Sequence, residues 1–234
     1  MMDTDTTAHA ALMSKWKNRP LHKGQVFIED GIICLEKWKH SKNKVLILLK
    51  EAYGEEESWS LVETIRDVWK GPKYKVFWTI AYWLYLLNKI EPAAIPLFPA
   101  TEKEFDACRE YLLSAAVVNL KKSAGNSASN YDELLSYVRK DRKLLREQLE
   151  IINPGIILCG YTKEYFDLFW NRKTEKIKNT EFLYKSGNTI IIDFWHPANQ
   201  YPDKLCYYAL GAVCQKVITE EHIGAGKARA GESS

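Results

Sequence analysis

Two side chains that can take part in catalysis follow apolar runs of the chain. His196 comes after TIIIDFW and before a proline, and Glu51 comes two residues after VLILL. An imidazole can donate a hydrogen bond to a group on which negative charge develops, and a carboxylate can stabilise positive charge or orient water. Each also has a simpler explanation, because a histidine at a strand end can be structural and Glu51 can pair with Lys50 or another surface cation.

A third polar side chain, Asn119, follows the apolar run AAVV. A carboxamide carries both a hydrogen-bond donor and an acceptor, so it can read the edge of a planar base. The simpler explanation is a cap or turn residue at the end of a strand. The elements that position these three residues therefore decide between the explanations.

Four short runs that are apolar throughout predict the strands that precede these residues. A strand that is buried on both faces, as in a parallel sheet, has a continuous apolar sequence rather than an alternating one. The runs are residues 45–49, 115–118, 156–159 and 190–192 with its flanks.

Segments with helical character separate these runs. Residues 131–152 carry apolar side chains near i, i+3, i+4 and i+7 spacing, and they end at an Asn-Pro-Gly sequence that breaks helices. Strands that alternate with helices predict an α/β protein, a three-layer α/β/α sandwich. The other helical patterns cover residues 75–90, 102–114 and 204–219, and residues 25–35 predict a small hairpin or an irregular entry segment.

Ligands of open parallel sheets bind at the carboxyl ends of the strands. Glu51, Asn119 and His196 follow three of the four predicted strands, so we expect them to meet at one edge of the sheet. Polar groups that converge beside apolar strands are typical of a binding or active site.

The composition restricts the class of protein and its partners. The chain has 234 residues, 46% of them hydrophobic, and we expect one domain over residues 25–221, with an N-terminal extension (1–24) and a disordered tail (222–234). The net charge of +3 and the basic runs 36–44 and 171–179 fit phosphate contacts or solvated faces. Five cysteines without a CxxC pair, and no apolar run long enough to span a membrane, predict a cytoplasmic monomer without a metal site.

Four motifs resemble those of the uracil-DNA glycosylase superfamily, in the family's order and spacing, over most of the chain. They are VLILLKEAYG, AVVNLKKSAGN, INPGIILCG and FWHPAN. The resemblance implies a central four-stranded parallel sheet between helices. It also implies removal of a damaged or modified base from DNA by hydrolysis of the N-glycosidic bond. No cofactor is expected, because the chain lacks the four spaced cysteines that hold an iron–sulfur cluster in some branches of the family.

The same resemblance implies roles for the three strand-end residues. Glu51 matches the glutamate of the family's GEAPG loop, Asn119 matches the asparagine that reads the base, and His196 matches the catalytic histidine. In the family's best-known branch the acid that activates water lies one place further along, where this chain has Ala52. The resemblance therefore does not itself assign water activation to Glu51.

Aromatic residues are the candidates for holding a flipped base. Phe77 lies near the family's stacking phenylalanine, with Trp78 and Trp59 as rivals and plain core packing as the alternative. Tyr53 replaces the proline of the GEAPG loop and Lys50 replaces its first glycine. These two changes lie in the expected pocket wall, and they are compatible with a base larger than uracil.

The expected contacts with DNA come from two loops. Lys121, Lys122 and Ser123 follow the second predicted strand and are candidates for holding backbone phosphates. Asn199 and Gln200 follow the histidine, where the family has a loop that enters the minor groove. We therefore expect DNA as the partner.

These observations predict a DNA glycosylase that acts on uracil or a larger modified pyrimidine and leaves an abasic site. The alternative is a catalytically silent member of the same fold that binds nucleic acid or a nucleotide. A flavodoxin-like or other small-molecule enzyme is disfavoured, because KEAYG after the first strand has one glycine and no phosphate-binding pattern.

Overall fold

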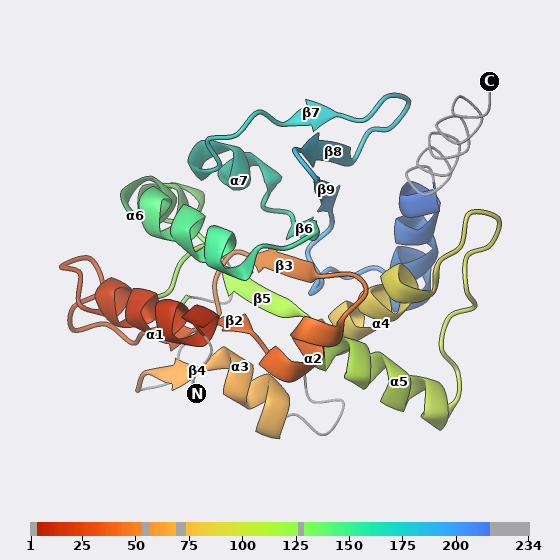
Figure 1. Cartoon of the computed structure of the whole chain (residues 1–234), viewed down its shortest axis with the longest axis horizontal. Helices are drawn as coiled ribbons and strands as arrows, with labels where there is room; N and C mark the ends of the chain where they lie inside the picture. The colour runs from red at the N-terminus through yellow and green to blue at the C-terminus, as the bar shows by residue number, and fades with distance from the viewer. Residues whose placement is uncertain (1–3, 53–56, 69–73, 126–128, 216–234) are drawn as a thin grey trace.

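The computed structural model describes residues 4–52, 57–68, 74–125 and 129–215. Helices and strands alternate along much of the chain (Figure 1). The helices are α1 (Thr4–Lys17), α2 (Leu35–His40), α3 (Leu61–Glu63), α4 (Lys75–Lys89), α5 (Glu102–Leu113), α6 (Tyr131–Ile152) and α7 (Lys163–Phe169). A π-helical turn, η1 (Thr64–Val68), continues α3, and residues 203–215 form a further helix.

A mixed sheet forms the centre of the fold. In the described ranges it has seven strands, in the order β2-β5-β3-β6-β9-β8-β7. The neighbours β5, β3, β6 and β9 pair in parallel, whereas β2, β8 and β7 pair antiparallel with their neighbours. The strands are β2 (Gly31–Ile32), β3 (Val45–Leu49), β5 (Ala116–Asn119), β6 (Ile156–Gly160), β7 (Glu175–Lys176), β8 (Leu183–Ser186) and β9 (Thr189–Phe194).

The α/β class predicted from the sequence is confirmed, but the sheet is larger than the four parallel strands that the resemblance implies. The hairpin that joins β8 to β9 accounts for part of the difference. Its turn contains Gly187, whose φ of 59° favours glycine, followed by an asparagine. Because β8 is antiparallel to β9, it extends the sheet without a crossover helix.

Both faces of the sheet are covered, which explains why the predicted strands are apolar throughout. Successive side chains of a strand point to opposite faces. Val45, Ile47 and Leu49 belong to one cluster of buried hydrophobic residues, and Leu46 and Leu48 belong to a second cluster. Burial on both sides leaves no position in β3 for a polar side chain before the strand ends.

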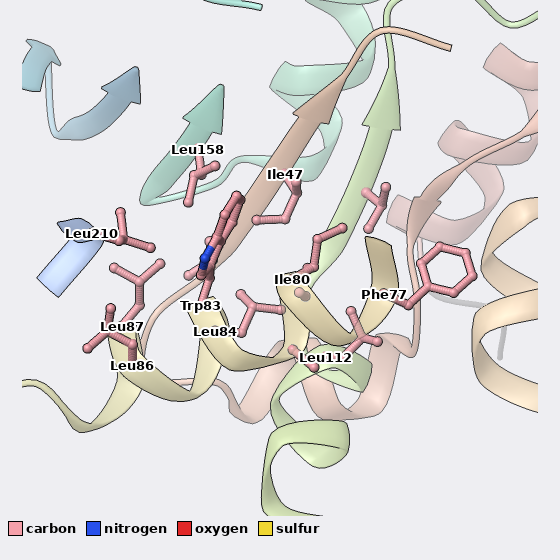
Figure 2. Packing of buried hydrophobic residues seen from close by; sticks show 14 of the residues in the cluster. Ile47, Phe77, Ile80, Trp83, Leu84, Leu86, Leu87, Leu112, Leu158 and Leu210 are labelled. Atoms are coloured by element: carbon pink, nitrogen blue, oxygen red, sulfur yellow. The ribbon is translucent and has the colours of Figure 1, made fainter. Parts of the chain in front are cut away.

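Helices α4 and α5 and residues 203–215 pack on the first face. Figure 2 shows Ile80 and Trp83 of α4 lying near Ile47 of β3 and Leu158 of β6, with Leu210 nearby. A helix that is buried within the domain is apolar nearly all round, as α4 is. A hydrogen bond holds the first turn of α4 beside the loop that follows β9. The Lys75 ammonium donates to the Asn199 carbonyl oxygen (3.1 Å).

Helices α1, α6 and α7 pack on the second face. Leu12, Met13 and Trp16 of α1 are buried in the second cluster, and the Trp16 indole nitrogen donates to Asp141 Oδ2 of α6 (2.9 Å). The buried residues of α1 therefore belong to the core of the domain, although the sequence assigned residues 1–24 to an N-terminal extension. The predicted tail, residues 222–234, lies outside the described residues.

The segment 25–35 is an irregular entry to the sheet rather than a hairpin. Its first strand, β1 (Ile28–Glu29), pairs in parallel with β4 (Trp59–Ser60) in a separate two-stranded sheet. Its second strand, β2, pairs with β5. Asp30 lies between the two and is buried. Within the described ranges, no helix has the length and apolar character needed to cross a membrane.

Candidate functional site

The register of the sheet brings the ends of its parallel strands to one level. Leu49 of β3 lies opposite Asn119 of β5, and the last residues of β6 and β9 lie opposite each other. Glu51 and His196 each follow two residues after the end of their strand. The three strand-end residues therefore lie on the same edge of the sheet.

Close packing at Gly160, the last residue of β6, holds the turn after β9 against this edge. A Cβ atom at Gly160 would lie 3.0 Å from Leu49 Cδ2 and 3.2 Å from Pro197 Cδ, so a larger residue would push these side chains apart. Pro197 is buried, and it directly follows His196. The proline thus fixes where the histidine leaves the strand.

A buried ion pair holds the backbone of Asn119 from both sides. Asp30 Oδ2 accepts a hydrogen bond from the Asn119 amide (2.7 Å), and the Lys122 ammonium donates to the Asn119 carbonyl oxygen (2.8 Å). Lys122 also donates to both Asp30 oxygens (2.6 and 2.8 Å), and Gln148 Nε2 donates to Asp30 Oδ1 (2.9 Å). Burial lowers the pKa of Lys122, and the Asp30 carboxylate opposes that shift.

The carboxamide of Asn119, in contrast, has no partner among the described residues. The residue is 2% exposed, and both Oδ1 and Nδ2 are buried without a hydrogen bond. A buried polar group in this condition costs about 1–3 kcal/mol. Native structures leave few such groups, and among the described residues Trp59 Nε1, Trp83 Nε1 and Gln148 Oε1 share this condition.

Glu51 is held by a cation and by a close glycine. Glu51 Oε2 lies 3.0 Å from the Lys121 ammonium, which also pairs with Glu133 Oε1 of α6 (2.7 Å). Burial alone would lower the pKa of Lys121, but its two carboxylate partners outweigh burial and raise it. A Cβ atom at Gly125 would overlap the Glu51 side chain, so a larger residue would displace the carboxylate from this place.

The surroundings of His196 favour its neutral form. Burial, together with the nearby Lys50 ammonium, lowers the pKa of the imidazole to about 4. His196 Nδ1 accepts a hydrogen bond from the Ala198 amide (3.1 Å), so in the neutral ring the proton is on Nε2. The imidazole can therefore donate through Nε2 without becoming charged.

Exposed aromatic residues surround the same edge. Trp195 and Tyr201 flank the histidine, with ring centroids 5.0 Å apart and exposed fractions of 38% and 51%. Tyr161, directly after β6, is 62% exposed, and the Lys50 ammonium lies 4.8 Å from its ring centroid. Large rings on a surface are suited to stacking on bases.

The structure does not support the predicted phosphate contacts of Lys121, Lys122 and Ser123. All three are buried, and their polar groups are used inside the protein. Ser123 Oγ lies 2.9 Å from His22 Nδ1, and His22 Nε2 lies 2.7 Å from Asp141 Oδ2. These are the residue types of a hydrolase triad, but the serine and the histidine are each 1% exposed, so a substrate has no access to the hydroxyl.

The other predicted site residues differ in their exposure and in their contacts. Asn199 stabilises the turn after β9, since its Nδ2 donates to the His196 carbonyl oxygen (2.8 Å) and its Oδ1 accepts from the Tyr201 amide (2.8 Å). Gln200 is exposed beside it. Phe77 is 7% exposed within the first hydrophobic cluster, which favours the core-packing alternative. Tyr53 lies outside the described residues.

Sequence reasoning missed Asp30 as part of the site. The signal was available, because Asp30 is an acid inside the mostly apolar stretch VFIEDGII. Its partner Lys122 is separated from it by 92 positions, and a single sequence does not reveal such a pairing.

Among the described residues, no group of three or more histidine, cysteine, aspartate or glutamate side chains is arranged to hold a metal ion. In comparisons by sequence, no protein-family model matches the chain and no curated protein matches it significantly. The function is therefore inferred from the residues at the strand ends.

Removing Asp30 tests the buried ion pair. In Asp30→Ala the Lys122 ammonium stays buried without its partner, and we expect a loss of about 3–5 kcal/mol in the free energy of unfolding. Urea denaturation measures the change. Glu150→Ala, which removes the exposed Arg172–Glu150 pair, is the control and should change little. Equal effects of the two substitutions would contradict the anchoring role.

Gly125→Ala tests the packing over Glu51. The added methyl group overlaps the carboxylate, and overpacking of this kind costs about 1–3 kcal/mol. Gly155→Ala is a matched control, since its nearest atom would lie 3.9 Å away. Thermal or urea unfolding should separate the two variants, and indistinguishable stabilities would show that Glu51 is not held as described.

Titration of His196 by NMR tests its neutral state. The imidazole should titrate with a midpoint of about 4, well below the ordinary histidine value of about 6.5. Because the folded pKa lies below the unfolded one, the unfolded state takes up the proton first as the pH falls. The stability that His196 contributes is therefore present above pH 6.5 and is lost between 6.5 and about 4. A midpoint near 6.5 would contradict the buried neutral ring.

Proposed function

We propose that this protein is a DNA glycosylase, a divergent member of the uracil-DNA glycosylase superfamily, which hydrolyses the N-glycosidic bond of a uracil or larger modified pyrimidine. The observation that carries the proposal is the buried, unpartnered carboxamide of Asn119 at the edge that also carries His196. The four family-like motifs suggest the superfamily, and three of them contain Glu51, Asn119 and His196, which follow strands of one α/β sheet.

In this proposal, Asn119 reads the extruded base. A pyrimidine presents a donor and an acceptor side by side on its exposed edge, and Oδ1 and Nδ2 of one carboxamide match both. The carboxamide is held for this purpose, because Asp30 and Lys122 fix its peptide groups. A base that satisfies both atoms also removes the cost of their burial.

His196 stabilises the leaving base in the same proposal. Cleavage of the bond between base and sugar leaves negative charge on the base, and the Nε2–H of a neutral imidazole can donate to its oxygen. The lowered pKa keeps the ring neutral at pH 7. The interaction therefore strengthens as charge develops, which is the requirement for lowering the barrier.

Glu51 completes the mechanism on the sugar side. A carboxylate there stabilises the positive charge that develops on the sugar and orients the attacking water. Lys121 and Gly125 fix the position of this carboxylate. The exposed rings of Tyr161, Trp195 and Tyr201 support a nucleic-acid substrate, because they offer stacking surfaces to neighbouring bases.

One observation favours the alternative, a catalytically silent protein that binds nucleic acid or a nucleotide. The carboxylate of Glu51 is 7% exposed and is already paired with Lys121. A carboxylate occupied in this way stabilises a cation less well than a free one. Binding through Asn119 would remain in such a protein, whereas base excision would be absent.

Abasic-site formation on a panel of oligonucleotides tests the proposal. The panel carries uracil and several larger modified pyrimidines, in single and double strands, and alkaline cleavage reveals the abasic site. We expect excision of at least one base, with a loss of about 10²–10³-fold in rate for Asn119→Ala and for His196→Ala. His40→Ala, an exposed histidine away from the strand ends, is the control.

Two results would count against the mechanism. Full activity of both variants would remove Asn119 and His196 from it. Binding of a modified oligonucleotide without excision of any base would favour the silent alternative.

A further inference from the structure

A groove lined by basic residues lies between α1 and α6, on the second face of the sheet. Its volume is about 630 Å³. The lining contains six cationic side chains together with one acid and one leucine: Lys15, Arg19, Arg139, Lys140, Arg142, Lys143, Leu144 and Glu147. None of these residues belongs to the candidate site at the strand ends.

Four of the cations have no ion-pair partner in the part of the chain that the structure describes. Lys15 pairs with Glu147 (3.2 Å), and Arg19 pairs with the buried Asp141. The four cations on α6 are exposed and take part in none of the ion pairs of the described residues: Arg139, Lys140, Arg142 and Lys143. The groove therefore has an excess of positive charge that an anionic partner could neutralise.

Three of these cations form a row along α6. Arg139, Arg142 and Lys143 have i, i+3 and i+4 spacing, which places them on one side of α6. On the facing side, both terminal nitrogens of Arg19 donate to the Lys140 carbonyl oxygen (3.1 Å each). The guanidinium at the rim is thus fixed before any ligand binds, which reduces the entropy lost on binding.

The chemistry of this row matches phosphate. Arginine presents a planar fork of donors that fits two phosphate oxygens, and the row contains two exposed arginines, Arg139 and Arg142. A lipid surface fits less well, since Leu144 is 5% exposed and offers no apolar side chain for insertion. A regular polyanion such as a phosphodiester chain can follow this row of cations.

We propose that the α1–α6 groove binds the phosphate backbone of nucleic acid, independently of base sequence. The groove is connected to the candidate site through α6. Glu133, in the first turn of this helix, pairs with Lys121 beside Glu51. Arg139 follows six residues later, about 9 Å along the helix axis.

The test uses the full chain and a fluorescein-labelled, unmodified 20-nucleotide DNA, with affinity measured by anisotropy between 50 and 200 mM salt. In the triple variant Arg139→Ala/Arg142→Ala/Lys143→Ala we expect binding at least 10-fold weaker. The slope of log K against log salt should fall in magnitude by about 2–3, since each lost phosphate contact removes about 0.7–0.9. Circular dichroism confirms that the variant is folded.

A charge-matched control distinguishes the effect of the groove cations on affinity from the effect of a lower net charge. Lys103→Ala/Lys178→Ala/Lys185→Ala removes three exposed lysines elsewhere on the surface and should leave affinity and slope near those of the unmodified protein. Equal losses in both triple variants, or no loss in the groove variant, would overturn the proposal. Groove-dependent binding of anionic vesicles or of a polyglutamate peptide, without binding of DNA, would also overturn it.

The outcome is independent of base excision. Because the probe is unmodified DNA and the readout is its affinity, the groove is tested whether or not the oligonucleotide panel shows glycosylase activity. Failure of the groove proposal and failure of the proposed activity are therefore distinguishable.

Discussion

The buried ion pair between Asp30 and Lys122 is the interaction on which the site depends. Both side chains are fully buried, and isolated charges in that position would be strongly destabilising. Their remaining hydrogen bonds go to the amide and carbonyl groups of Asn119 and to Gln148. The pair thus joins the entry segment, the end of β5 and α6 at the residue that we propose reads the base.

This arrangement explains how an unsatisfied carboxamide can persist in the interior. The peptide groups of Asn119 are fully used, and the register with β3 fixes the strand on its other side. The side chain therefore bears the cost of burial while the surrounding structure holds it in place, as is common at functional sites. His196 is held similarly, by the buried Pro197 after it and by the Ala198 amide on Nδ1.

The sequence predicted the local elements well and the long-range partners poorly. Strands buried on both faces have a distinctive apolar pattern, and α6 spans residues 131–152 as its periodicity indicates. The place of α1 was missed because the burial of Trp16 depends on Asp141, 125 positions away. For the same reason Lys121 and Lys122 looked like phosphate ligands: their charge is visible in the sequence, whereas the acids that pair with them become neighbours only in the fold.

The side-chain amide of Asn119 gives the most direct test of the central claim. In ¹⁵N-labelled protein, its NH₂ resonances can be followed by NMR while a single-stranded oligonucleotide is added, with one modified pyrimidine or with the matched unmodified base. The account predicts no hydrogen-bonded partner in the free protein and a large downfield shift with the modified base alone. Resonances that do not change with any base, or that already show a strong hydrogen bond in the free protein, would contradict it.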